Sequence, residues 1–250
     1  MSFESYANIS FRAFNFSNKQ QELVAKKTQI LEDVFEHYNF WPASMLFVGF
    51  NPAVLNDWDC KIYVTDLSAE AQAWLKERQE FVYIPREDLA QYGKQVDCVV
   101  ATEEYFTFAE TDAGQRKLVD DICSLARGLV ITTLRDYKNQ DFKDREFSMP
   151  SIIRNEKDYR IYFEFNDPNS QDRNVSHRRV FEIQNENFLS HEGFVCRNMY
   201  FKQLAKFSMD AGASQFLVHK NIMYKSLIKK NYEHVISIKF EQYGRDSETT

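Results

Sequence analysis

Glycine, proline and long apolar runs are all scarce in this chain, and each shortage excludes a class of protein. Only 7 of its 250 residues are glycine and only 5 are proline. A glycine-rich loop of the kind that wraps phosphates with backbone amides is therefore not available. The chain starts without a basic segment and has no apolar stretch long enough to cross a bilayer, so we expect neither a signal peptide nor a membrane span.

Cysteine and basic charge are also limited. The 4 cysteines stand far apart, without a CxxC pair, which indicates reduced and mostly buried thiols in a cytoplasmic protein and no metal site. The formal net charge is -6 and the sequence pI is about 5.5. A broad electrostatic grip on nucleic acid is therefore not favoured, although a local basic patch stays open as an alternative.

The chain does contain enough apolar material for a core, and it is arranged in alternating strands and helices. Apolar residues make up 44% of the chain and aromatic residues 15%. The alternation predicts an α/β protein with a doubly wound, parallel sheet whose strand-to-helix loops meet at one edge. The expected strands are residues 45–48, 61–66, 81–84, 97–101 and 129–133; the expected helices are 19–38, 68–79 and 112–126, with Gly128 ending the last.

Two of these strands end in residues suited to a ligand. The first is followed by Gly49, Phe50, Asn51 and Pro52, and the second ends in Asp66. In doubly wound folds a turn at the first position lies against a ligand, and an acid at the second binds a ribose. The structural alternatives are an ordinary tight turn and a helix-capping acid.

The second half of the chain has a different pattern. Alternating strands at 160–165 and 179–183 predict a hairpin insertion over 156–184. A helix is expected over 198–211, and late strands at 215–218 and 234–240 are expected to pair at the end of the sheet. The lysines between 220 and 230 form either a phosphate-binding face or a solvated segment. We expect an irregular arm over 1–17 and a loose tail over 243–250.

This layout resembles the class I S-adenosylmethionine-dependent methyltransferase fold. The segments that carry the resemblance are Leu46-Phe47-Val48-Gly49-Phe50-Asn51-Pro52, Tyr63-Val64-Thr65-Asp66, Val96 to Ala101 and Gly128 to Thr133. The stretch from Ile131 to Asn139 is similar to methyltransferase-like proteins of tailed marine phages, which would place the chain in the host cytoplasm or the virion. The resemblance implies a mostly parallel, seven-stranded sheet, S-adenosylmethionine as cofactor, and an inserted or appended hairpin.

The resemblance also implies roles for particular residues. The cofactor-binding candidates are Gly49, Asn51, Asp66, Leu67 and Asp88, and the candidates for the catalytic and acceptor pocket are Glu103, Glu104, Tyr105, Arg135 and Tyr137. The motifs of nucleobase methylation, an Asp or Asn followed by two prolines and an aromatic, or a Pro-Cys nucleophile, are absent. An oxygen or carboxyl acceptor on a small molecule or protein therefore fits better. The structural alternatives are solvated acids at Asp88, Glu103 and Glu104 and a surface turn at Arg135.

One departure from the family supports a different class of function. The first motif of the family has two or three glycines, whereas only Gly49 is present here, so Phe50 and Pro52 could obstruct the cofactor. The alternative is a catalytically inactive fold that serves as a structural or interaction component, docking a protein partner through the 156–184 hairpin. A nucleotide-binding α/β protein of another kind is less favoured, because neither GxGxxG nor a Walker motif occurs.

Overall fold

The computed structural model describes residues 3–136, 146–169, 171–172, 174–229 and 232–241, and it contains two sheets. The larger is a seven-stranded sheet with the order β11-β12-β5-β4-β1-β2-β3. Its strands are β1 Ser44–Val48, β2 Lys61–Thr65, β3 Val82–Tyr83, β4 Val96–Ala101, β5 Ala126–Leu134, β11 Gln215–Lys225 and β12 Tyr232–Lys239. The predicted doubly wound, mostly parallel sheet is thus confirmed.

The register of the sheet brings the ends of strands β1, β2, β4 and β5 to one edge. β1 runs parallel to β2 and β4, and β4 runs parallel to β5. β12 is antiparallel to both β5 and β11, which gives the predicted late pair. The strands are continuous apolar runs because helices cover both faces of the sheet.

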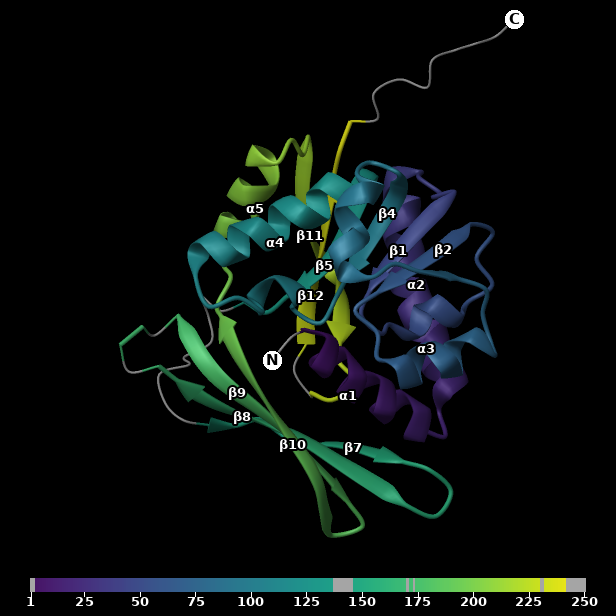
Figure 1. Ribbon diagram of the computed structural model, residues 1–250, viewed down its shortest axis with the longest axis vertical. Coiled ribbons are helices and arrows are strands. Elements are labelled where there is room, and N and C mark those ends of the chain that lie inside the picture. The colour runs from purple at the N-terminus through teal and green to yellow at the C-terminus, as the bar shows by residue number, and fades with distance from the viewer. Residues whose placement is uncertain (1–2, 137–145, 170, 173, 230–231, 242–250) are drawn as a thin grey trace, which may run out of the picture.

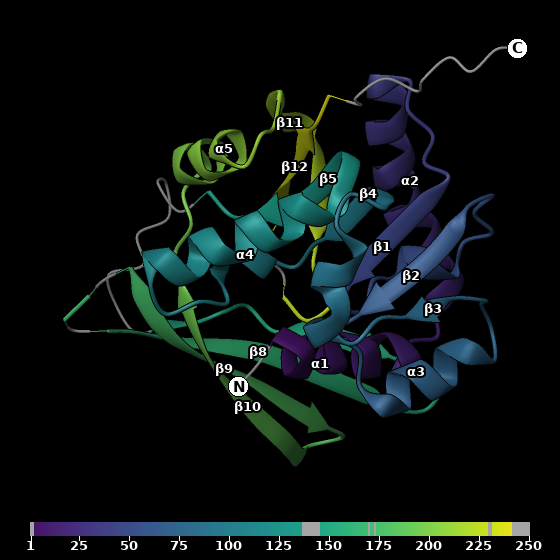
Figure 2. The same ribbon diagram turned by 45° about the horizontal axis from the view of Figure 1, so that its top comes forward.

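Helices α4 (Asp112–Leu125) and α5 (Phe201–Asp210) lie together over one face of the sheet, and α2 (Gln20–Tyr38) lies on the other (Figures 1 and 2). Helix α3 (Ala69–Lys76) follows β2 and is capped by Ser68, whose Oγ accepts the backbone N–H of Ala71. Three short 3-10 segments complete the connections: η1 Pro52–Leu55, η2 Arg86–Tyr92 and η3 Tyr105–Thr107. Among the described residues, none of the helices combines the length and the apolar character needed to span a membrane.

Gly128 does not end a helix, and that prediction was wrong. Helix α4 stops at Leu125, and Gly128 lies inside β5. A Cβ at this position would come within 2.8 Å of the Phe40 ring. The glycine therefore permits close packing of Phe40 on the sheet instead of a helix terminus.

The expected irregular arm over 1–17 was also wrong, because Phe3–Phe16 forms helix α1. Its sequence is rich in Ser, Asn and Phe, which favour helix only weakly, so local preference did not reveal it. Tertiary packing stabilises this helix instead, because the side chains on one broad face of it are buried. In both views α1 lies between the second sheet and the rest of the molecule (Figures 1 and 2).

The second sheet replaces the simple hairpin expected over 156–184. It contains β6 Glu146–Phe147, β7 Ser151–Arg154, β8 Tyr159–Pro168, β9 Val175–Gln184 and β10 Asn187–Arg197, ordered β10-β9-β8-β6 with β7 also on β8. The β8–β9 hairpin is present, and β10 adds a further strand beside β9 through ten residue pairs from Asn187 to Arg197. β10 was missed because its polar residues lack a clear alternation. The tail over 243–250 lies outside the described residues.

The second sheet is polar toward the molecule and apolar toward solvent. On its inner face Tyr162, Glu164 and Arg178 are at most 4% exposed. On its outer face the rings of Phe163 and Phe181 stack with centroids 5.0 Å apart, and Phe147, 64% exposed, lies 4.7 Å from Phe165. This orientation reverses the usual pattern, in which the apolar side of a two-faced sheet is the buried one.

Candidate functional site at the carboxyl edge of the main sheet

Left-handed backbone marks the carboxyl edge of the main sheet. Gly49 after β1 has φ 76°, Asp66 after β2 has φ 54°, and Glu103 and Glu104 after β4 have φ 60° and 58°. A non-glycine residue rarely adopts this region, and two consecutive glutamates there are rarer still. Such strain is retained where surrounding contacts fix it, and it concentrates at ligand sites. The turn at Gly49 is adjacent to β2, because the Gly49 N–H donates to the Thr65 carbonyl at 2.9 Å.

Asp66 is buried at the end of β2 and is paired with a cation. Arg86 Nη1 donates to Asp66 Oδ2 at 3.0 Å, and Arg86 Nη2 donates to the Tyr105 hydroxyl at 3.0 Å. Burial raises the pKa of Asp66, and the nearby Arg86 only partly opposes this rise. The structure therefore brings two predicted site residues, Asp66 and Tyr105, together through an arginine that the sequence did not single out.

Helix α1 covers the Gly49 turn. A Cβ placed on Gly49 would lie 2.6 Å from Cε1 of Phe3 and 3.0 Å from Cβ of Ala7, so the glycine is required for this close approach. The Phe3 ring also packs edge-on against Tyr105 at 4.8 Å and Phe108 at 5.0 Å. With α1 in place, the space beside Gly49 is filled by Phe3.

Polar contacts hold α1 in this position. Arg12 donates to Glu182 of the second sheet, with Nη2 and Oε2 3.1 Å apart. Ser68, the cap of α3, donates to Oδ1 of Asn8 at 2.9 Å. The helix is therefore fastened to both the second sheet and the main domain, and it is not a loosely attached arm.

The other cofactor candidates have local structural roles. Asn51 caps η1 by accepting the Ala53 N–H at 2.9 Å. Phe50 packs against Phe11, with ring centroids 5.4 Å apart, so its ring contributes to the core under α1. Leu67 is buried, and Asp88 accepts a hydrogen bond from Gln91 at 3.1 Å within η2.

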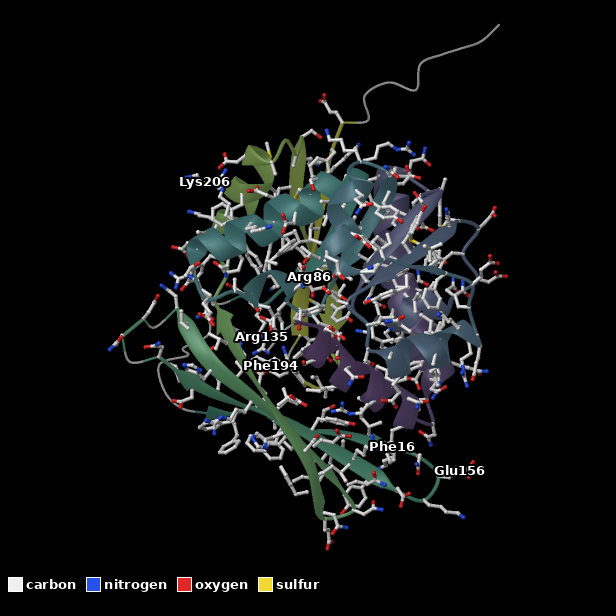
Figure 3. The ribbon with its side chains drawn as sticks, in the orientation of Figure 1. Phe16, Arg86, Arg135, Glu156, Phe194 and Lys206 are labelled. Carbon is white, nitrogen blue, oxygen red and sulfur yellow. The ribbon has the colours of Figure 1, made fainter. Side chains whose placement is uncertain are left out.

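A buried ionic cluster follows β4, centred on Glu104. Its Oε2 lies 2.7 Å from Arg135 Nε, 3.0 Å from Lys229 Nζ and 3.4 Å from Arg178 Nη1. Figure 3 shows the labelled Arg135 where the second sheet meets the main one. Glu104 itself is 0% exposed, so the alternative of a solvated acidic loop is wrong here.

Glu164 supplies the second negative charge of this cluster. It lies 3.3 Å from Arg135 Nη2 and 3.6 Å from Lys229 Nζ. Burial alone would raise the pKa of Glu164, but Lys229 and Arg135 outweigh it and lower that pKa. Charges sequestered from water are retained only when they are paired in this way. The cluster thus joins β4, β5, β8, β9 and the segment before β12.

Glu103 belongs to an adjoining network of hydroxyl groups. The Tyr224 hydroxyl donates to Glu103 Oε1 at 2.9 Å, and the Tyr6 hydroxyl, from α1, donates to Oε2 at 3.5 Å. Asn51 reaches the same network, because its Nδ2 donates to Thr102 Oγ1 at 3.2 Å and Thr102 contacts Tyr224. Three of the predicted residues, Asn51, Glu103 and Glu104, therefore line one continuous polar interior.

Glu233 on β12 has an environment that favours its neutral form. It is fully buried, it accepts a hydrogen bond from Thr133, and its Oε1 has no hydrogen-bond partner in the described part of the chain. Burial, with Glu104 and Glu103 nearby, raises the pKa of Glu233 to about 8. A pKa raised in this way favours the protonated form of the carboxyl group at neutral pH.

Sequence reasoning missed several members of this interior. Glu164 and Arg178 lie on strands whose alternation was visible, but the alternation does not say which side faces inward. Lys229 appeared as part of a basic surface segment and is instead 1% exposed. Tyr137, the remaining predicted residue, lies outside the described residues.

The comparisons with known proteins bear on the fold. No family model matches the chain, and no curated protein matches it. Solved structures do match. The sugar N-methyltransferase KedS8 from Streptoalloteichus has a TM-score of 0.63 at 10% identity, covering 87% of this chain and 88% of that chain. An S-adenosylmethionine-dependent methyltransferase from Clostridium acetobutylicum has a TM-score of 0.60 at 9% identity, covering 86% and 91%.

A third solved structure is that of the amino pentose methyltransferase CalS10 from Micromonospora echinaspora with S-adenosylmethionine bound. Its TM-score is 0.54 at 12% identity, and the match covers 90% of this chain and 92% of that chain. At these identities the likeness establishes the architecture: the chain has a class I methyltransferase fold. Fold alone does not assign an activity.

Proposed function

We propose that this protein is an S-adenosylmethionine-dependent methyltransferase whose cofactor site opens when the first turns of α1 move. The observation that carries the proposal is the pairing of the Gly49 turn with Asp66 at the ends of adjacent parallel strands, on this fold. Asp66 would accept hydrogen bonds from ribose hydroxyls, and Gly49 would let the backbone approach the methionine part. When bound, the cofactor supplies an electrophilic methyl group.

The acceptor that we favour is an oxygen or carboxyl group on a small molecule or protein. Support comes from the missing base-methylation motifs and from Arg86, whose side chain is 43% exposed beside Asp66. If a ribose occupies Asp66, Arg86 loses its ion-pair partner and becomes available to hold an acceptor carboxylate. The Glu104 cluster then positions the residues around the acceptor but does not contact it, because its members are sealed by their own ion pairs.

Calorimetric titration with S-adenosylmethionine and S-adenosylhomocysteine tests the proposal. We expect binding by the wild type and a loss of at least tenfold in Asp66→Asn, which keeps the shape but removes the charge. Glu70→Gln, an exposed acid in the first turn of α3, is the matched control and should bind like the wild type. The absence of binding heat from either ligand at millimolar concentration would overturn the proposed methyltransferase function.

A second candidate function is an interaction module without catalysis. Two observations favour it: Phe3 fills the space beside Gly49, and the outer face of the second sheet carries the half-buried, stacked Phe163 and Phe181 beside the exposed Phe147. Apolar side chains on one exposed face are typical of a surface that another protein covers. If the titrations give no heat, this candidate predicts association in solution that Phe163→Ser and Phe181→Ser weaken, measured by sedimentation.

A further inference from the structure

A cavity of about 680 Å³ lies between α2, β7 and the ends of β11 and β12, apart from the Gly49 and Asp66 site. Its size falls within the range of small-molecule sites. Among the described residues, five cationic side chains and no carboxylate line it: Lys19, Lys26, Lys27, Arg154 and Lys225. Of the described lysines between 220 and 230, for which the sequence left a phosphate-binding face open, only Lys225 lines this cavity.

The charges of this cavity are only partly neutralised. Lys19 and Lys26 pair with the exposed Glu22, at 3.6 Å and 2.5 Å. The side chains of Arg154 and Lys225 make no ion pair within the described residues. The amino end of α2 also lies here, where Lys19 caps the helix without a side-chain hydrogen bond. The partial positive charge of a helix start adds to the attraction for an anion.

Apolar side chains line another part of the cavity wall, alongside the polar Ser17, Asn18, Ser151 and Ser226. Leu23, Ile30 and Leu227 contribute to it, together with exposed Ile152 and Met223, which are 50% and 37% exposed. The lining thus combines exposed apolar side chains with two cations, Arg154 and Lys225, that have no ion pair in the described part of the chain. The lining therefore suits a molecule with one anionic end and one apolar end.

The cavity walls are held in place by contacts between elements distant in sequence. The Asn18 N–H donates to the Arg154 carbonyl at 3.1 Å, and Ser151 Oγ donates to the Leu227 carbonyl at 3.0 Å. At its inner end Lys27 is 5% exposed, with Nζ 3.1 Å from the Tyr224 ring centroid, and it donates to the Lys225 carbonyl. Burial lowers the pKa of Lys27 to about 8, and the nearby Glu103 and Glu233 partly oppose that lowering.

We propose that this cavity binds an anionic amphiphile, a carboxylate or phosphate group attached to an apolar chain. Arg154 and Lys225 hold the head group at the mouth, and the apolar wall formed by Leu23, Ile152 and Met223 takes the chain. The site stands independently of the proposed methyltransferase activity, because it shares no residue with the Gly49 and Asp66 site.

Calorimetric titration with dodecanoate, dodecyl phosphate and uncharged dodecanol, below their aggregation concentrations, tests the site on the full chain. We expect one or both anions to bind at least tenfold more tightly than dodecanol, and their ratio identifies the preferred head group. The double variant Arg154→Gln/Lys225→Gln should lose at least tenfold in anion affinity without changing dodecanol binding. Lys206→Gln, an exposed lysine on α5 (Figure 3), is the matched control and should change nothing.

Separate readouts keep this site distinct from the proposed function. Ile152→Asp places a negative charge, of the same sign as the head group, on the apolar wall. Because Ile152 is half-exposed, the variant should still fold. Binding of both anions should fall at least tenfold. Asp66→Asn should leave amphiphile binding unchanged. Anions and dodecanol binding equally, or anion affinity unchanged in Arg154→Gln/Lys225→Gln, would overturn the proposal whether or not S-adenosylmethionine binds.

Discussion

Truncating Phe3 to alanine tests most directly whether α1 controls access to the Gly49 turn. Phe3 is 4% exposed and packs against Tyr105, Phe108 and Gly49. Replacing a buried phenylalanine by alanine costs about 3–5 kcal/mol in a well-packed site. Part of that cost weakens the closed position of α1 relative to an opened one.

The same loss of packing free energy predicts a gain in cofactor affinity. If S-adenosylmethionine binds only when Phe3 has left Gly49, its apparent affinity is reduced by the rarity of the open state. Weakening the closed state by about 3 kcal/mol then raises the apparent affinity about 100-fold, since each 1.4 kcal/mol is tenfold. Calorimetry measures the affinity, and urea unfolding measures the accompanying loss of stability.

Phe35→Ala is the matched control for this experiment. Phe35 is 0% exposed in α2, where it packs against Trp41 and Trp58 and makes no ring contact with α1. It should destabilise the fold by a similar amount and leave the affinity unchanged. An affinity in Phe3→Ala equal to that of the wild type would refute the reasoning, because the cofactor would then enter without displacing α1.

The remaining predictions concern the same interior. Glu104→Gln removes the common partner of Arg135, Arg178 and Lys229, and we expect a loss of about 3–5 kcal/mol in urea unfolding; a loss below about 1 kcal/mol would show that the cluster is not sealed. Glu233 is an acid whose pKa is raised in the folded state to about 8, so its contribution is fully present below its unfolded pKa and is lost as pH rises toward 8. The unfolding free energy of the wild type should therefore fall relative to Glu233→Gln by up to about 1.4 kcal/mol per pH unit, and a difference that is constant between about pH 5 and 8 would contradict this. Gly49→Ala should cost about 2 kcal/mol or more, from its φ of 76° and its contact with Phe3, and Phe3→Ala should remove part of that cost.

Much of the main sheet could be predicted because its signals are local. Continuous apolar strands such as 97–101, separated by amphipathic helices, are typical of a parallel sheet whatever lies elsewhere in the chain. The ends of β1 and β2 were placed correctly for the same reason, so Gly49 and Asp66 could be singled out. Helix α1 could not be found, because its Ser, Asn and Phe residues form a helix only when the carboxyl edge and the second sheet pack around it.

The sequence by itself determined the alternation of strands and helices, and it placed the Gly49 turn and Asp66 at the ends of two successive strands. It also showed that β8 and β9 each have one polar and one apolar side. Only the tertiary structure decided that the polar side, with Glu164 and Arg178, faces inward. The physical reason is that Glu104 and Lys229, more than about 50 residues away along the chain, supply the charges that make an inward polar face stable.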